Sequence, residues 1–440
     1  MVPPSGGSPA STPDTAAGSG VNSPVLHADV AVIGGGVIGH CIAWEARLSG
    51  RSVVVIDDEP GSGASWAAAG MLAPVSELHY QEEDLLELML ESSHLWPAFA
   101  ASLARAGAPD FGYLTTPTLA VGADAADRRA LMDLRAVQQA NGLLVETLTV
   151  REARAKEPLL SPAISCALDI PADHQVDPRR LIASLRQVLA GHDQGSGTAV
   201  AGAREGFAVH HRATALLWED GRVSGVKLAS GGTVRAGETI VANGLQAADL
   251  GGLPDWIQLP LRPVYGDILR LGVPLHLRPL VTSTVRGLVH GVPVYIVPRQ
   301  DGTVVIGATQ REDALPAAGD TVAAGRAVSA GGVYQLLRDA QVLLPAVAEL
   351  ELLECTTRAR PATPDNAPLL GRVPAPGPGH IPGLIIATGF YRHGVLLSPA
   401  AALICRGLLD GKEDPRWQAL NPDRFSSQPQ AAFQFTKETA

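Results

Sequence analysis

Residues 28–57 combine two different spacings of hydrophobic positions. An apolar run before Gly34 predicts a β-strand, and a second one, Val53–Ile56, predicts another. Between them, apolar residues recur at the spacing of one helix face, at Ile38, Ile42, Ala43 and Ala46. A strand, a glycine turn, a helix and a second strand are typical of the unit that begins a parallel α/β sheet.

The rest of the chain is predicted to mix helices with short strands. Helices are expected over residues 77–105, 124–141, 151–159 and 331–344, and from Pro178 with Asp177 as the N-cap. Strands are expected as a pair within 113–122, and near 213–218, 222–228 and 239–244. Several β segments over 261–309 imply a mixed or antiparallel sheet outside the first unit. Residues 61–74 are small and predict a loop followed by a short helix.

Length and charge restrict the class of protein. A chain of 440 residues with 46% hydrophobic residues predicts two packed globular domains. The net charge of −10 and the absence of a Lys/Arg-rich run argue against nucleic acid or an anionic membrane surface as a partner. No apolar run approaches the roughly 18 residues needed to cross a bilayer.

Cysteine usage and the two ends of the chain add three expectations. Four cysteines without a C-x-x-C pair suggest neither a disulfide framework nor a zinc site, so we expect no metal and a reduced, cytoplasmic protein. Residues 1–24 are rich in Pro, Ser, Gly and Thr and lack the pattern of a signal peptide. We expect them to form a disordered leader, and 426–440 a disordered tail.

The glycine turn of the first unit has the G-x-G-x-x-G pattern of dinucleotide-binding proteins. Gly34 allows a sharp turn, Gly36 lets a pyrophosphate approach the backbone, and Gly39 lets the helix pack close to the sheet. The N–H groups of Val37 and Ile38 would face the phosphates at the helix N-terminus. Asp57, 18 residues after Gly39, suits the ribose hydroxyls and disfavours NADP. The motif alone does not separate FAD from NAD.

A second segment, residues 383–410, repeats the order of strand, glycine-flanked loop and helix. We expect a helix N-terminus at His393–Leu397 to point at a ligand, where it would stabilise negative charge on a reduced flavin. Asn243 and Gly244, at the end of another apolar strand, are also expected to face the nucleotide.

Several motifs in a fixed order carry a family resemblance. They are GGGVIG, the GSGASWAAAGMLAP stretch, DHQVDPRRL, YIVPR with VVIGAT, RARPATPDNAPLLG, and ATGFYRHGVLLSP. With them the chain resembles the D-amino-acid-oxidase-like flavoenzymes, and among these the glycine oxidases of thiamine biosynthesis, over residues 28–425. The resemblance favours FAD over NAD and also suggests a homo-oligomer.

The resemblance also implies a fold and its division into domains. We expect an α/β fold of the glutathione-reductase-like type, with a Rossmann-like FAD-binding domain and a substrate domain built on a mixed or antiparallel sheet. The FAD-binding domain would be discontinuous, over 25–102, 170–250 and 357–425, and the substrate domain would cover 103–169 and 251–356.

Roles for individual residues follow from the same resemblance. Arg360 would clamp the substrate carboxylate in two parallel hydrogen bonds, and Tyr295 would donate another. Taken alone, Arg360 fits a surface ion pair equally well, and Tyr295 fits a strand core. The residues implied to contact the cofactor are Gly34, Gly36, Val37, Ile38, Gly39, Asp57, Asp58, Ala64, Ser65, Ala69, Gly70, Met71, Ala215 beside the adenine, and Tyr391, Arg392, His393, Gly394, Val395, Leu396 and Leu397 along the flavin ring.

This chain departs from the family pattern at several positions. Phe390 stands where His is usual, His393 where Asn is usual, and Ala359 where Leu is common, and the PVYGD segment around Tyr265 and Asp267 also differs. These changes leave FAD expected but the preferred amine open, and His393 is a structural residue or a proton carrier. Some relatives attach flavin through a cysteine. The nearest here, Cys355, is out of step with theirs, so we expect non-covalent FAD.

The function implied by the resemblance is oxidation of glycine, or of a small amine such as sarcosine, to glyoxylate, ammonia and H₂O₂, by hydride transfer to the flavin with O₂ as final acceptor. The glycine imine would be supplied to a thiazole synthase in thiamine biosynthesis. Three alternatives stay open: the same fold acting on a D-amino acid or proline or donating to another acceptor, a non-catalytic flavin-binding partner, and an NAD-dependent dehydrogenase.

Overall fold

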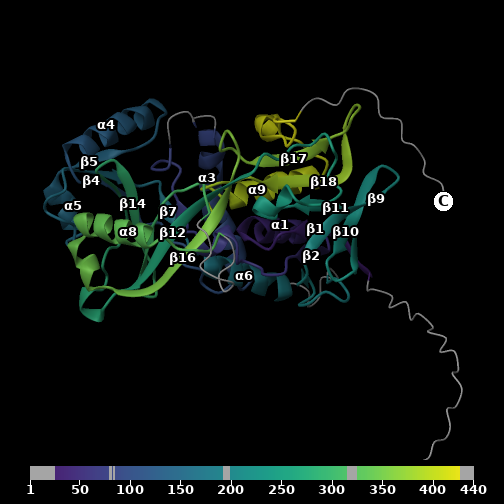
Figure 1. The fold of residues 1–440 in the computed structure, drawn as a ribbon, viewed down its shortest axis with the longest axis horizontal. Helices are drawn as coiled ribbons and strands as arrows, with labels where there is room; N and C mark the ends of the chain where they lie inside the picture. Colours follow the sequence, from purple (N-terminus) through teal and green to yellow (C-terminus); the bar gives the residue numbers. More distant parts are fainter. Residues whose placement is uncertain (1–24, 79–81, 83–84, 192–198, 315–324, 427–440) are drawn as a thin grey trace, which may run out of the picture.

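A computed structural model describes residues 25–78, 82, 85–191, 199–314 and 325–426 (Figure 1). Two large sheets, one at each end of the longest axis, form the framework of the described chain. The expected leader, and the expected tail beyond residue 426, lie outside the described residues.

The first sheet has the parallel core of a dinucleotide-binding fold. Its path runs β17-β18-β11-β1-β2-β8, and β9 and β10 extend from β11 as an antiparallel ribbon. Ile33 of β1 pairs with Val241 of β11 and with Ile56 of β2, so β1 is central. The strands are β1 (Val25–Ile33), β2 (Val53–Ile56), β8 (Ala208–Val209), β9 (Ala213–Glu219), β10 (Arg222–Leu228), β11 (Thr233–Val241), β17 (Leu369–Pro374) and β18 (His380–Thr388).

Four helices pack with the first sheet into one apolar core. They are α1 (Val37–Leu48), α3 (Leu86–Arg105), α6 (Pro178–Gly191) and α9 (Ser398–Leu409). Their buried faces, which include Trp44 and Trp96, share that core with Val30 and Val32 of β1. Asp177 caps α6 as predicted, because its Oδ1 accepts the backbone N–H of Arg179 at 2.9 Å.

The second sheet is mixed, as predicted. Its order is β16-β12-β15-β14-β13-β4-β6-β5, and of these pairs β13 and β4 are parallel while the others are antiparallel. Its strands are β4 (Thr118–Gly122), β5 (Glu146–Leu148), β6 (Cys166–Ile170), β12 (Arg262–Gly272), β13 (Thr284–Val289), β14 (Val292–Pro298), β15 (Thr303–Gly307) and β16 (Glu351–Ala362). The α/β class, with a Rossmann unit and a separate mixed sheet, is therefore confirmed.

Shorter elements complete the second half of the molecule and the junction between the sheets. α8 packs on the second sheet through Leu336 and Ala340, and α4 and α5 lie near its far edge in Figure 1. The remaining elements are α2 (Ala64–Ala67), α4 (Ala125–Ala140), α5 (Val150–Lys156), α8 (Ala330–Leu343), the small pair β3 (Met71–Leu72) and β7 (His174–Gln175), and the 3-10 turns Gly244–Ala247, Leu275–Leu277, Pro345–Glu349 and Pro415–Leu420.

Two expected elements differ from the structure. The strand pair within 113–122 is wrong: only Thr118–Gly122 forms a strand, because Pro117 has no N–H for a ladder, and Leu114 makes a single bridge to Gln175. The helix expected from residue 77 begins at Leu86, and part of the intervening stretch lies outside the described residues. No helix in the described ranges is both long and apolar enough to span a membrane.

Candidate cofactor and substrate site

A cavity of about 710 Å³ lies where the first sheet meets the second. Its lining runs from Gly34, Gly36 and Asp57 at the ends of β1 and β2 to Tyr295 and Arg360 on the second sheet. The volume is within the range of sites for cofactors and small molecules. The carboxyl ends of parallel strands contribute to it, as is usual for ligand sites of open α/β sheets.

The end of the cavity at α1 has the geometry expected for a pyrophosphate. Gly34 has φ of +110°, and a Cβ there would strike the backbone of Ala242. Gly36 lines the cavity beside the helix N-terminus, and a Cβ there would lie only 3.3 Å from Ser65 Oγ. The N–H of Val37 donates to Oγ of Ser65 at 3.0 Å, so the serine hydroxyl stands over the first turn of α1, within reach of a phosphate bound there.

Asp57 is held by backbone groups at the mouth of this end. Its Oδ2 accepts the N–H of Gly35 at 2.6 Å and its Oδ1 accepts that of Glu59 at 2.8 Å. Burial raises the pKa of Asp57, and the two N–H donors oppose the rise. Each oxygen keeps a free lone pair, so a ribose hydroxyl has an acceptor here.

Small residues form part of the cavity wall. They include Ala67, Ala68, Ala69 and Gly70, and Asn243 lines the cavity as well. The Asn243 Oδ1 atom is buried, and no donor among the described residues reaches it. An acceptor in that state can receive a hydrogen bond from a bound ligand or from a water molecule. The residues present therefore fit a dinucleotide that extends toward the second sheet.

Arg360 and Tyr295 occupy the far end, and two glycines make room for them. Arg360 lies on β16, and its guanidinium passes over Gly266 of β12, where a Cβ would collide with it. Tyr295 on β14 pairs with Gly307 of β15, where a Cβ would collide with the phenol. The neighbouring strands thus leave open space for both polar groups at the cavity wall.

The electrostatics of this pair suit an anion. Among the described residues, no carboxylate lies within ion-pair distance of Arg360, and its side chain faces the cavity. Burial raises the pKa of Tyr295 to about 12, although the nearby Arg360 charge lowers it. The phenol therefore keeps its proton over the physiological range and donates. A guanidinium and a hydroxyl donor in this arrangement can both donate hydrogen bonds to a carboxylate.

A second arginine at the same end is already paired. Arg286, opposite Tyr295 on β13, makes a short ion pair with Glu77. Burial pushes the pKa of Glu77 up, but the charges of Arg286, His393 and Arg392 outweigh it and lower the pKa to about 2. Glu77 is therefore a carboxylate at every ordinary pH.

The structure brings most of the residues singled out from the sequence into one cavity. Those that line it are Gly34, Gly36, Val37, Ile38, Asp57, Asp58, Ala64, Ser65, Ala69, Gly70, Met71, Tyr295, Arg360, Tyr391, Arg392, Gly394 and Val395. Asn243, Gly244, Phe390 and Tyr265 line it as well.

Five of the named residues lie outside that lining. Gly39 packs α1 against the Gly34 carbonyl, and Ala215 on β9 bridges to Gly251. His393 is buried, with its Nδ1 atom 3.8 Å from Glu77 Oε2. Leu396 and Leu397 belong to the core. Cys355, the candidate for flavin attachment, is exposed on β16 and does not line the cavity either.

Sequence reasoning missed other residues of the lining. Glu77 and Arg286 were not singled out, and neither were Arg326 and Arg358 near the end of β2. The signal available for Arg286 was its place in a strand adjacent to the one that carries Tyr295. Glu77 offered only an acid among apolar neighbours, which is a weak signal.

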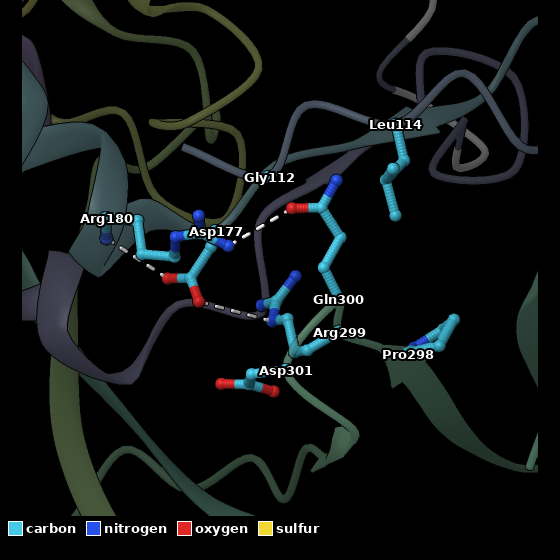
Figure 2. A pocket seen from close by; sticks show the side chains of 8 residues that line it. All are labelled: Gly112, Leu114, Asp177, Arg180, Pro298, Arg299, Gln300 and Asp301. Carbon is cyan, nitrogen blue, oxygen red and sulfur yellow. Dashed lines mark hydrogen bonds and ion pairs between the residues drawn. The ribbon is translucent and has the colours of Figure 1, made fainter. Parts of the chain in front are cut away.

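A smaller hollow lies between the start of α6 and the end of β14, and the polar side chains around it connect these two elements (Figure 2). Arg180 Nη1 donates to Gln300 Oε1 at 3.1 Å, and Arg299 Nε lies 3.8 Å from Asp177 Oδ2. Arg299 also donates to the Ala69 carbonyl, which ties β14 to the cofactor wall. These side chains fill the hollow and leave no room for a ligand.

Comparison with known proteins agrees with this geometry. Residues 29–406 match the family described as FAD dependent oxidoreductase. The chain belongs to this family. FAD is therefore its cofactor, and the large cavity is the site that fits it. The resemblance predicted from the motifs is confirmed.

Individual members of the family show similarity over most of the chain. Glycine oxidase of Geobacillus kaustophilus is 33% identical over 88% of this chain and 93% of its own length. Its crystal structure superposes with a TM-score of 0.76, covering 91% of this chain and 99% of that one at 30% identity. Iminodiacetate oxidase from Chelativorans sp. BNC1 gives a TM-score of 0.74 at 25% identity, over 91% and 100% of the two chains.

A longer relative joins two activities in one chain. The bifunctional protein ThiO/ThiG of Trichormus variabilis is 30% identical over 93% of this chain. The match covers 57% of that relative, so this chain spans little more than half its length.

Proposed function

We propose that this protein is an FAD-dependent oxidase of glycine, or of a small secondary amine such as sarcosine. The observation that carries the proposal is the Arg360 guanidinium, which has no carboxylate partner in the described part of the chain and lies near the protonated Tyr295 in the cavity that fits the cofactor. One cation and one hydroxyl donor match one carboxylate. Similarity to a glycine oxidase, at 33% identity over 88% of this chain, supports it.

The residues of the chain bind and orient the substrate. Arg360 and Tyr295 hold the carboxylate, and the cavity wall excludes water from the amine. Bound FAD supplies the two-electron acceptor. Glycine loses a hydride from Cα and a proton from nitrogen. Water adds to the resulting imine, glyoxylate and ammonia separate, and O₂ takes the two electrons with two protons to give H₂O₂.

The proposed reaction needs no strong base to abstract a proton. Glu77, with a pKa of about 2, and Tyr295, with a pKa of about 12, are poorly matched to remove a proton near pH 7. Oxidation of an amine that arrives neutral needs orientation rather than a base, which agrees with these two groups.

We further propose that the oxidation serves thiamine biosynthesis by supplying the glycine imine to a thiazole synthase. The similarity to a bifunctional ThiO/ThiG protein supports a functional link of this kind. We also propose that FAD is held without a covalent bond, since Cys355 is exposed and outside the cavity lining. Acid precipitation should release the flavin into the supernatant, and flavin that stays in the pellet would contradict this.

The decisive experiment is an anaerobic titration of the purified yellow protein with glycine and with sarcosine, followed by air and a peroxide assay. Bleaching of the flavin band, then recovery with one H₂O₂ per turnover, is the expected result. Bleaching by D-alanine or D-proline but not by glycine or sarcosine would replace the substrate. A band that no amine bleaches would instead indicate a non-catalytic flavin-binding partner.

A further inference from the structure

Three arginines of the cavity lining lie near Glu77 or Tyr295, namely Arg360, Arg286 and Arg392. Within the described chain, Arg286 is paired with Glu77 and Arg392 with Glu82, while Arg360 has no carboxylate partner. Glu77 and Tyr295 line the same cavity. The Tyr295 phenol lies within Coulomb range of Arg360, Arg286 and Glu77, which places these groups around one point.

The register of the second sheet fixes this arrangement. Arg286 of β13 stands directly opposite Tyr295 of β14, so its side chain and the phenol emerge on the same face. Glu77 lies on the segment that follows β3 and lines the same cavity. The side chains of Arg286 and Glu77 are 17% and 11% exposed, so the pair is largely shielded from water. A shielded pair holds its charges together more strongly than a surface pair.

We propose that Glu77 is a specificity-determining residue that neutralises Arg286 and so restricts the site to substrates with one carboxylate. This inference rests on the proposed function, because it assumes that Arg360 binds the substrate carboxylate. With Glu77 in place, Arg286 offers no net charge to a second carboxylate. A dicarboxylic amine would bring that second anion next to Glu77, where like charges repel.

Another acid near Arg286 does not replace Glu77. Asp173 also lies within Coulomb range of Arg286, but its oxygens accept the backbone N–H groups of Val75 and Ser76 at 3.1 and 3.3 Å. It does not line the cavity. Loss of the Glu77 charge would therefore leave Arg286 facing the cavity with a vacant donor fork.

The test uses two ligands that cannot be oxidised as amines. Oxydiacetate has two carboxylates and methoxyacetate has one, and each Kd is measured from the change in the visible spectrum of the bound flavin. We expect wild type to bind oxydiacetate no tighter than methoxyacetate. In Glu77→Gln, oxydiacetate should bind at least about tenfold tighter than in wild type, as a new charge-assisted contact allows, with methoxyacetate nearly unchanged.

Two further variants separate the proposed cause from others. Adding Arg286→Met to Glu77→Gln should remove the gain, because the freed cation is then absent. Glu238→Gln removes the carboxylate from the Arg372 pair, outside the cavity, and should give no gain. If Glu77→Gln does not fold with flavin, the same measurement is made on Glu77→Met, a second neutral replacement of similar volume.

Three results would overturn the inference: a wild type that already prefers oxydiacetate, folded Glu77 variants without the gain, or a gain that survives removal of Arg286. Turnover is not part of the readout. If glycine fails to bleach the flavin but these ligands behave as described, glycine is not the substrate, while the carboxylate site at Arg360 and the role of Glu77 stand.

Discussion

Gly39 packs so closely on Gly34 that a β carbon on Gly39 would lie well within 3.0 Å of the Gly34 carbonyl oxygen. The contact joins the first turn of α1 to the end of β1, and it sets the height of the helix N-terminus over the cavity. Because the obstacle is backbone rather than a flexible side chain, a larger residue could be accommodated only if the helix moved.

Gly39→Ala should therefore weaken FAD binding. Moving α1 away from β1 shifts the helix N-terminus, with the Ile38 N–H and the Ser65 hydroxyl that Val37 holds, and a shift of about 1 Å in such a site is expected to cost roughly tenfold or more in affinity. The Kd of FAD, measured by quenching of flavin fluorescence in the apoprotein, checks this. Gly377→Ala, where a Cβ would meet nothing within 4 Å, is the matched control and should bind FAD like wild type. Equal affinity in both variants would contradict the proposed packing role.

Arg360→Lys should reduce kcat/KM for glycine by roughly 10- to 100-fold, mainly through KM. Lysine keeps the charge but loses the planar fork that matches a carboxylate. The FAD content should stay that of wild type, because the guanidinium lies at the substrate end. Steady-state kinetics with peroxide detection give the two constants. A KM that does not change would remove Arg360 from the substrate site.

Tyr295→Phe should lower kcat/KM for glycine about tenfold, the value of a hydrogen bond to a charged group. The ring still fills the space beside Gly307. With its pKa near 12, the phenol stays protonated across the working range, so the ratio of wild-type to variant kcat/KM should be constant from pH 6 to pH 10. A ratio that falls toward 1 as pH rises through 8 or 9 would show that the phenol ionises there.

Local sequence patterns predicted the elements whose causes are local. The first βαβ unit, α8 and the Asp177 cap depend on residues close together in the chain, and they appear where expected. The contact of Glu77 with Arg286 joins residues 209 positions apart. The sequence around Glu77 or Arg286 does not predict this contact. The contact forms only because the segment after β3 packs against the second sheet.

The open space at the substrate end also depends on contacts between residues that are far apart in the chain. Arg360 and Tyr295 were found through their motifs, but the role of Gly266 and Gly307 follows only from the pairing of β12 with β16 and of β14 with β15. A slip of one residue in either pairing would place the side chains on the wrong face. The register is set by long-range contacts, so the sequence predicted the polar groups and not the space around them.

His40 should make the protein less stable in mild acid. It is buried in α1, with Nδ1 3.0 Å from the Gly36 carbonyl oxygen. Burial lowers its pKa from 6.5 to about 4, against the opposing effect of that hydrogen bond. Between these values the unfolded chain binds a proton that the folded chain does not, so stability falls as pH drops through this window. From pH 7.5 to pH 5 this residue alone should cost about 2 kcal/mol.

His40→Gln removes the titrating group and keeps a donor for Gly36. Urea unfolding at both pH values, at one fixed FAD concentration, gives the loss of stability for each protein. The stability lost between pH 7.5 and pH 5 should be smaller in the variant, by the amount of about 2 kcal/mol calculated for His40. This difference does not depend on how stable the variant is at pH 7.5, because the other titrating groups are common to both chains. An equal loss in the two proteins would mean that His40 is protonated in the folded state at pH 5. The prediction of a neutral, buried His40 ring would then be wrong.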